Sequence, residues 1–227
     1  MPVILSLETS TDLCSVALHD NKNLLAHEEI HEPQSHAARL APLIDGILQK
    51  SDVRLAELNA VAVTAGPGSY TGLRIGTSTA KGLCYALDIP LIAVGTLELL
   101  AFQAIRSNAA RALLCPMLDA RRMEVYCLLM DPDFRILEPV SARIIDENSF
   151  TELLERNQVL FFGNGATKFK EISTHPNAIF LEGIYPVASA LGVMADEKLM
   201  KKQFEDPVHF KPFYLKEFVA KKAGAGH

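Results

Sequence analysis

The sequence predicts an α/β fold with two subdomains, each a mixed β-sheet flanked by helices. Residues 3–30 contain three consecutive strand patterns, followed by helix, strand and helix patterns. The same strand-hairpin opening starts again near residue 112. In the first half, a fully apolar run at residues 60–63 leads directly into a glycine-rich turn and a helix. This repeated order predicts two side-by-side sheets rather than one continuous sheet.

The first predicted subdomain covers residues 1–106. Its first helix carries apolar residues at helical spacing on one side, and Pro42 either kinks this helix or marks its first turn. The predicted elements are strands at 3–7, 13–19 and 24–30, a helix at 35–50, a strand at 60–63, a helix at 73–87, a strand at 91–94 and a helix at 96–106.

The second predicted subdomain covers residues 107–186. A helix at 187–203 is expected to bridge both subdomains or to return to the first, and residues 204–227 are expected to form a tail with a disordered end. The predicted elements of the second subdomain are strands at 112–118, 123–130, 135–138 and 142–145, a helix at 150–156 capped by Asn148 or Ser149, and strands at 158–162 and 178–181.

Charge and composition restrict the functional classes. The net charge of −5 argues against a protein whose whole surface grips nucleic acid, but it allows a subunit of a nucleic-acid-modifying assembly. The chain has no apolar run long enough to span a membrane, and its first residues do not resemble a signal peptide. A cytoplasmic protein with reduced core cysteines is therefore expected, since no Cys-x-x-Cys pair occurs among Cys14, Cys84, Cys115 and Cys127.

The glycine-rich turn at residues 65–76 is the most distinctive stretch. A strand, a glycine turn and a helix leave backbone N–H groups free at a helix N-terminus, which suits a phosphate or a partner's carboxylate. The turn lacks the Gly-Lys-Ser/Thr of a phosphate-binding P-loop and the third glycine of a dinucleotide-binding turn. A tight turn without a ligand is equally consistent with the sequence. No cofactor is predicted, and the weak candidates for cofactor contacts are Gly66, Gly68, Gly163 and Gly165.

Several short motifs in residues 1–105 resemble those of a known protein family. They are Leu7-Glu8-Thr9-Ser10 with Asp12, Ser35-His36 with Pro42-Leu43-Ile44, the glycine-rich turn at 65–76 and the strand at 91–94. With them, the chain resembles the actin-like ATPase superfamily of ribonuclease H-like folds, and within it the TsaB (YeaZ) family. These proteins are the shorter paralogues of TsaD, the enzyme that installs threonylcarbamoyl on tRNA adenosine. The resemblance is looser beyond residue 105.

The chain departs from the catalytic paralogue at two sites. In TsaD, two metal-binding histidines four residues apart follow the strand that matches residues 91–94, but residues 95–100 contain no histidine and place Leu100 at a ligand position. The phosphate hairpin of TsaD is rich in glycine, whereas this chain has Ala120, Arg121 and Arg122 there. The resemblance therefore implies no catalytic residues, no metal and no enzymatic activity of its own.

Other polar residues admit plainer interpretations. His27 and His31 are four residues apart, and solvated loop residues are favoured over a metal site because Glu32 and a proline follow. Arg121 and Arg122 are expected at a solvated hairpin tip, with a role in gripping tRNA as the alternative.

The resemblance implies a non-catalytic subunit that supports a TsaD-like enzyme in threonylcarbamoyl transfer to tRNA adenosine beside the anticodon. It also implies a TsaE-like ATPase partner, a separate TsaC enzyme that makes threonylcarbamoyl-AMP, and a self-dimer. Contact with tRNA through the complex is left open. The alternative is a stand-alone weak ATPase, acyl kinase or peptidase of the actin-like superfamily, which a complete metal site would favour.

The helix at 73–87 is apolar or small on two faces, so one face packs on the sheet and the other needs a cover, either the helix at 35–50 or a partner chain. Gly82 inside this helix allows another helix to approach closely. The resemblance implies that one four-helix surface serves both the self-dimer and the pairing with TsaD. The predicted interface residues are His36, Leu40, Leu43, Ile47, Ile75, Ser78, Thr79, Gly82, Tyr85 and Ala86.

Overall fold

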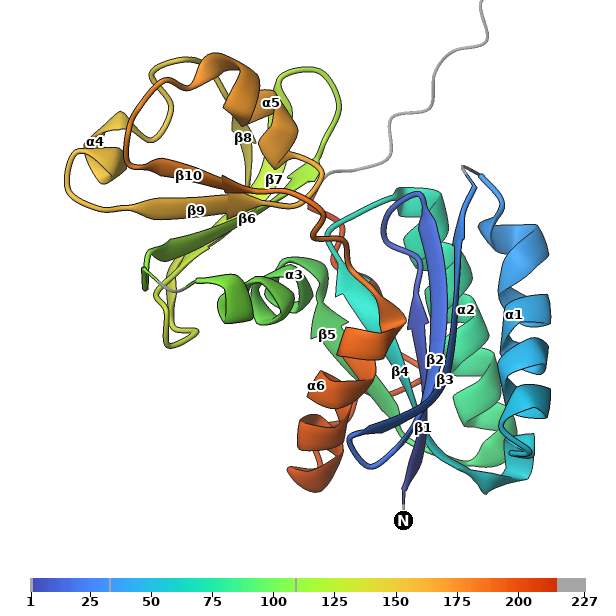
Figure 1. The fold of residues 1–227 in the computed structure, drawn as a ribbon. Helices are drawn as coiled ribbons and strands as arrows, with labels where there is room; N and C mark the ends of the chain where they lie inside the picture. Colours follow the sequence, from blue (N-terminus) through green and yellow to red (C-terminus); the bar gives the residue numbers. More distant parts are fainter. Residues whose placement is uncertain (1, 33, 109, 216–227) are drawn as a thin grey trace, which may run out of the picture.

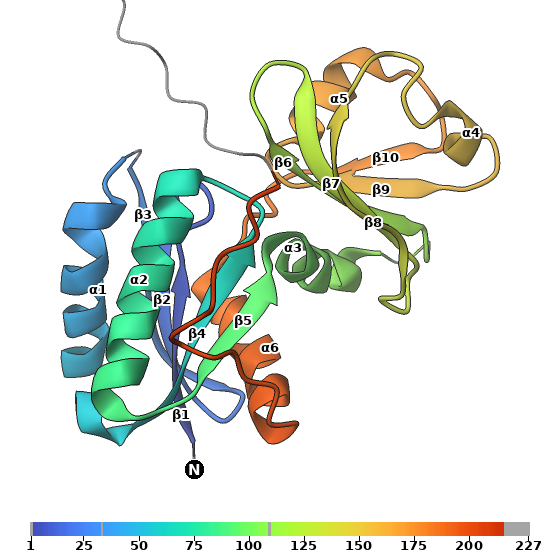
Figure 2. The ribbon, with the colours of Figure 1, turned by 180° about the vertical axis from the view of Figure 1, so that it is seen from behind.

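The computed structural model describes residues 2–32, 34–108 and 110–215 and consists of two lobes (Figure 1). Each lobe contains a five-stranded mixed sheet, with strand orders β3-β2-β1-β4-β5 in the first and β10-β9-β6-β7-β8 in the second. Helices cover the sheets on both faces in the first lobe (Figures 1 and 2). The predicted α/β class with two mixed sheets is confirmed.

In the first lobe, the strands β1, β2 and β3 form an antiparallel meander, and β4 and β5 extend the sheet in parallel to β1. The helices α1 and α2 cover one face of the sheet. The elements are β1 Val3–Glu8, β2 Leu13–Asp20, β3 Asn23–His31, α1 His36–Lys50, a 3₁₀ turn Leu55–Glu57, β4 Leu58–Gly66, α2 Tyr70–Leu87, β5 Leu91–Gly95 and α3 Thr96–Ala104.

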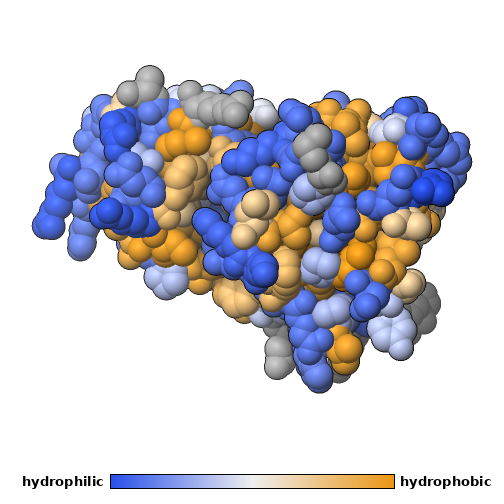
Figure 3. Space-filling view, turned by 90° about the horizontal axis from the view of Figure 1, so that it is seen from below, coloured by the Kyte–Doolittle hydropathy of each residue, from blue (hydrophilic) through white to orange (hydrophobic). Residues whose placement is uncertain are grey.

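The alternation of side chains along β1 explains why both faces of the first sheet are covered. Leu5 and Leu7 point into a core beneath α1 and α2, whereas Ile4 belongs to a second core beneath α6 (Ala188–Met200). All four cysteines are buried and unpaired, as expected. Seen from below, the surface mixes apolar with polar side chains (Figure 3). None of the helices in the described part of the chain is long and apolar enough to cross a membrane.

The second lobe differs from the prediction in two details. The strands expected at 135–138 and 142–145 form one continuous strand, β8, in which Pro139 is tolerated because β8 lies at the sheet edge. The helix expected from residue 150 is a single turn whose N-cap is Phe150, not Asn148 or Ser149. The elements are a 3₁₀ turn Ile105–Ser107, β6 Leu113–Asp119, β7 Glu124–Met130, β8 Ile136–Ile144, α4 Thr151–Leu154, β9 Val159–Phe162, α5 Ala166–Ile172 and β10 Ala178–Leu181.

After the second lobe the chain returns to the first. The N–H of Ala188, at the start of α6, donates to Ser15 Oγ on β2 at 3.0 Å, and Lys198 Nζ donates to the Ala93 carbonyl on β5 at 2.7 Å. We propose that residues 1–106 and α6 form the first domain and residues 107–186 the second. His27 and His31 lie on β3 and not in a loop, which corrects the expectation, because the meander continues through residue 31.

Residues 203–215, here called the C-terminal strap, run between α2 and β5 towards the gap between the lobes (Figure 2). The Glu205 N–H donates to the Leu91 carbonyl at 2.9 Å, and the Phe213 N–H donates to the Ala65 carbonyl at 2.7 Å. Lys81 Nζ on α2 donates to the carbonyls of Val208 and Phe210 at 3.1 and 3.0 Å. The predicted tail is therefore packed against the first lobe up to residue 215. Its end, expected to be disordered, lies outside the described residues.

Candidate functional site

A cleft of about 1110 Å³ separates the two lobes. One wall comes from the turn after β1 and from the glycine-rich turn before α2. The opposite wall comes from the β6–β7 hairpin, and the end of the strap closes one side. The lining residues are Ser10, Thr11, Asp12, Pro67, Gly68, Ser69, Tyr70, Thr71, Leu118, Asp119, Ala120, Arg121, Arg122, Met123, Glu124, Tyr126, Ile144, Asn164, Phe213, Tyr214 and Leu215.

A buried carboxyl group organises the wall of the first lobe. Glu8 is fully buried, and its Oε1 accepts hydrogen bonds from the N–H and the hydroxyl of Ser10 at 2.6 and 2.5 Å. Burial raises the pKa of Glu8 to about 7, although the bonds from Ser10 oppose this rise. The Ser10 carbonyl in turn accepts from the Ser69 N–H at 2.7 Å. Glu8 thus shapes the turn that meets the start of α2.

The chain's own backbone packs closely against the glycines that were candidates for cofactor contacts. A Cβ atom on Gly68 would lie 2.4 Å from the Ser10 carbonyl oxygen, and one on Gly66 would lie 2.7 Å from the Phe213 carbonyl oxygen. Gly163 and Gly165 in the second lobe would meet the backbone of Met117 and Leu118 at 2.4 and 2.7 Å. The four weak cofactor candidates therefore have an internal reason to be glycine, namely close backbone packing.

The hairpin wall is strained at its tip. Arg121 and Arg122 both adopt the left-handed conformation, with φ of 71° and 50°, which costs a non-glycine residue on the order of 1 kcal/mol each. Asp119 supports this turn because its Oδ1 accepts from the Arg121 N–H at 2.6 Å and from Lys168 Nζ at 2.7 Å. Both arginine side chains are exposed, and none of the ion pairs among the described residues involves them.

A pair of tyrosine rings, tilted by 45° to each other, lines the cleft where the strap ends. The rings of Tyr70 and Tyr214 have centroids 4.9 Å apart, and the Arg74 guanidinium lies 5.4 Å from the Tyr70 ring centroid. Phe213 and Tyr214 remain 47% and 37% exposed. The sequence interpretation missed these strap residues because it treated the segment as a tail. The density of aromatic residues between 210 and 214 was the available signal.

The segment at the TsaD histidine positions is used for packing. Leu97 and Leu100 on α3 are buried in the core of the second lobe, and Thr96 is also buried. Within the described ranges, no group of three or more His, Cys, Asp or Glu side chains could hold a metal ion.

The predicted partner surface divides into two sets. His36, Leu40, Leu43 and Ile47 are buried in the chain's own core, which corrects their assignment, because they form the inner face of α1 against the sheet. The other six residues lie on α2 and are accessible to different degrees. Ile75 and Thr79 are half-buried, while Ser78, Gly82, Tyr85 and Ala86 are exposed.

Four exposed residues of α2 recur at helical spacing along one side of the helix, and the exposed Arg74 lies one turn before the first of them. Tyr85 is 81% exposed, and a Cβ atom on Gly82 would have nothing within 4 Å. Here "the α2 face" means Ser78, Gly82, Tyr85 and Ala86. This face presents small, uncharged side chains and one aromatic ring to solvent.

Comparisons with known proteins identify the family. A family model described as "TsaD: tRNA N6-adenosine threonylcarbamoyltransferase" matches residues 24–224. The tRNA threonylcarbamoyladenosine biosynthesis protein TsaB of Bacillus subtilis is 33% identical over 175 residues, which cover 74% of this chain and 74% of that protein. The chain belongs to the TsaB family. This confirms the resemblance that was inferred from the sequence motifs.

Two further similarities support the assignment to the TsaB family. The TsaB protein of Escherichia coli is 42% identical over 123 residues, so the matched part spans 54% of this chain and about half (52%) of that protein. The solved structure of YeaZ from Pseudomonas aeruginosa matches with a TM-score of 0.81 and 26% identity, covering 95% of this chain and all of that chain (100%). The two-lobed arrangement is therefore the fold of this family.

Proposed function

We propose that the chain is a non-catalytic subunit that binds a TsaD-like enzyme and supports threonylcarbamoyl transfer to tRNA adenosine. The names of the TsaB relatives, tRNA threonylcarbamoyladenosine biosynthesis proteins, point to this pathway. The observation that carries the proposal is the α2 face, which leaves Tyr85 at 81% exposure beside Gly82 and Ser78. A large aromatic ring beside small residues is typical of the centre of an interface, where the ring is an anchor and the small residues allow close approach.

The small, uncharged side chains of the α2 face favour a helix partner, with the cation Arg74 at the border of this face one turn before Ser78. The neighbouring cation Lys81 is engaged by the carbonyls of Val208 and Phe210 in the strap, which holds it to one side of the helix. Gly82 costs an isolated helix about 1 kcal/mol relative to Ala. Close packing of a second helix over Gly82 would offset this cost.

The packing of α3 supports a role without catalysis. Leu100, at the position of a TsaD metal ligand, is fully buried in the core of the second lobe. The cleft wall that would approach phosphates carries Arg121 and Arg122 instead of glycines. We assign the chemistry to the partner enzyme and the support of that enzyme to this chain, with a TsaE-like ATPase as a third component.

Co-elution with the organism's TsaD homologue on a sizing column tests the proposal. Gly82→Arg should leave a folded chain that neither self-associates nor co-elutes, because the added bulk and charge would occupy an apolar seam. The matched control is Thr174→Arg, which adds the same side chain on an exposed loop of the second lobe. Because one surface is proposed for both contacts, adding the TsaD homologue should also dissociate the self-dimer. If Gly82→Arg co-elutes as Thr174→Arg does, the interface lies elsewhere.

A further inference from the structure

We propose that the mouth of the interlobe cleft binds a single-stranded segment of RNA, with a base stacked at Tyr214 and phosphates held by Arg121 and Arg122. This inference rests on the proposed function, because it assigns the part of the chain that would touch the tRNA beside its modified adenosine. The features of the RNA that the cleft would recognise are its unpaired bases and its phosphates, each of which carries one charge.

The pair of tyrosine rings supplies the base-binding half. Tyr214 packs against Tyr70 with ring centroids 4.9 Å apart, and Arg74 covers Tyr70 at 5.4 Å from its ring centroid. Tyr70 supports one side of the Tyr214 ring while 37% of Tyr214 stays exposed. An ordered, exposed aromatic ring in a cleft is the usual platform for unpaired bases, and neighbouring Phe213 extends it.

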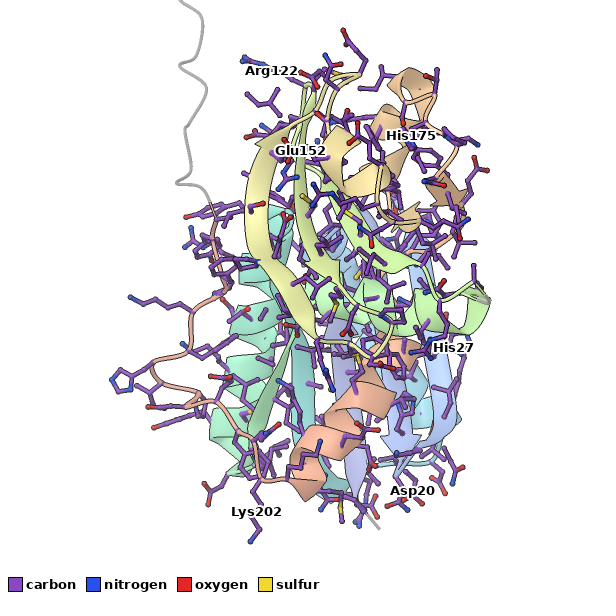
Figure 4. The ribbon with its side chains drawn as sticks, turned by 90° about the vertical axis from the view of Figure 1, so that its left-hand side faces the viewer. Asp20, His27, Arg122, Glu152, His175 and Lys202 are labelled. Carbon is purple, nitrogen blue, oxygen red and sulfur yellow. The ribbon has the colours of Figure 1, made fainter. Side chains whose placement is uncertain are left out.

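The hairpin rim supplies the phosphate-binding half. Arg121 and Arg122 line the cleft and are exposed, and the ion pairs among the described residues leave both guanidinium groups unengaged. Arg122 lies at the outer tip of the second lobe, far from Lys202 at the opposite end of the molecule (Figure 4). The left-handed turn, supported by Asp119, presents two adjacent cations at a position where glycine would relieve strain. Guanidinium groups bind phosphate oxygens in a bidentate manner.

The carboxylates of the cleft favour RNA over a free nucleotide. Asp12, Asp119 and Glu124 also line it, and Asp119 is compensated by Lys168 at 2.7 Å. These acids would repel the concentrated charge of a triphosphate. In single-stranded RNA each phosphate carries one charge, so the backbone can follow the arginines at the rim. The exposed Asp12 carboxylate, which lines the cleft, can then accept hydrogen bonds from base amino groups.

The size of the cleft agrees with a polymer segment. Its volume of about 1110 Å³ exceeds the upper end of the range typical of sites for one small ligand, which is about 1000 Å³. Tyr70 and Thr71, at the start of α2, line the cleft. The cleft and the α2 face therefore share one helix.

Fluorescence anisotropy with a labelled anticodon stem-loop tests the inference, with the full chain alone and in complex with the TsaD homologue. Tyr214→Ala should weaken binding between about 5-fold and 150-fold. Arg121→Gln with Arg122→Gln should weaken it and make the slope of log affinity against log salt shallower by about 1.4, since each lost phosphate contact contributes about 0.7. The matched control, Lys201→Gln with Lys202→Gln, removes the same charge at the far end and should bind as the wild type does.

Two additions keep the test decisive. Arg121→Gly with Arg122→Gly removes the charge while relieving the left-handed strain, so weak binding by this variant cannot reflect misfolding. All variants should still co-elute with the TsaD homologue, which separates failure of this inference from failure of the proposed function. Equal affinity of all variants for the stem-loop would overturn the inference. Displacement of the stem-loop by stoichiometric ATP would also overturn it, because the cleft would then be a nucleotide site.

Discussion

Thr9 and Gly72 join the turn after β1 to the first turn of α2. The Thr9 hydroxyl donates to the Gly72 carbonyl at 2.8 Å, and a Cβ atom on Gly72 would lie only 2.0 Å from the Thr9 carbonyl oxygen. One turn further along, a Cβ atom on Gly76 would lie 2.3 Å from Thr9 Oγ1. Gly72 and Gly76 therefore allow the first turns of α2 to pack closely against the turn after β1.

Two glycines of α2 should respond to alanine in opposite directions. Gly72→Ala should lower the free energy of unfolding by about 3 kcal/mol, because its Cβ atom would overlap the Thr9 backbone. Gly82→Ala should raise it by up to about 1 kcal/mol, since its Cβ atom would meet nothing within 4 Å and alanine favours the helix. Urea denaturation measures both variants. Similar changes in both would contradict the packing role of Gly72.

The buried Glu8 should make stability depend on pH. Its pKa of about 7 in the folded chain lies above the ordinary value of 4.5, so the folded chain holds the proton more tightly than the unfolded chain. The contribution of Glu8 is therefore complete below pH 4.5 and is lost as the pH rises through 7. Relative to the wild type, Glu8→Gln should gain up to about 3 kcal/mol between pH 4.5 and pH 8.

Unfolding free energies at pH 4.5, 6 and 8 measure this difference. Because the glutamine amide oxygen can still accept from Ser10, the variant should keep the turn. A constant difference between Glu8→Gln and the wild type across this range would show that Glu8 titrates at its ordinary pKa.

Lys81 should hold the C-terminal strap against α2. Lys81→Met removes the donor to the carbonyls of Val208 and Phe210, so cleavage of residues 203–215 by a protease of broad specificity should become several-fold faster. The control is Lys22→Met, which removes only an exposed ion pair with Glu197 and should have little effect. Equal cleavage rates for both variants would show that other contacts hold the strap.

The fold class and the order of elements could be predicted because periodicity and turn residues carry them locally. The apolar run in β4 and the helical spacing of α2 are examples, and the sequence words around Gly68 identified the family. The position of the strap could not be predicted, because local sequence patterns do not reveal contacts between distant parts of the chain. Its position depends on Lys81 and Ala65, which are more than a hundred residues away in sequence.

The candidate surface was only partly predictable for the same reason. Helical spacing shows that Leu40 and Ile47 share one face of α1, but it does not show whether a sheet or a partner covers that face. In the structure, the first sheet covers this face of α1. The left-handed conformation of Arg121 and Arg122 could not be predicted from the sequence either, because glycine or asparagine usually occupies such positions.

We propose that the α2 face supports a TsaD-like enzyme during catalysis. The initial rate of threonylcarbamoyl transfer to tRNA by the organism's TsaD homologue, supplied with TsaC and TsaE homologues, tests this role. Wild-type chain and Thr174→Arg should raise this rate equally, and Gly82→Arg should leave it at the level without the chain. A full rate with Gly82→Arg, or no effect of the wild-type chain, would show that the α2 face does not support the enzyme.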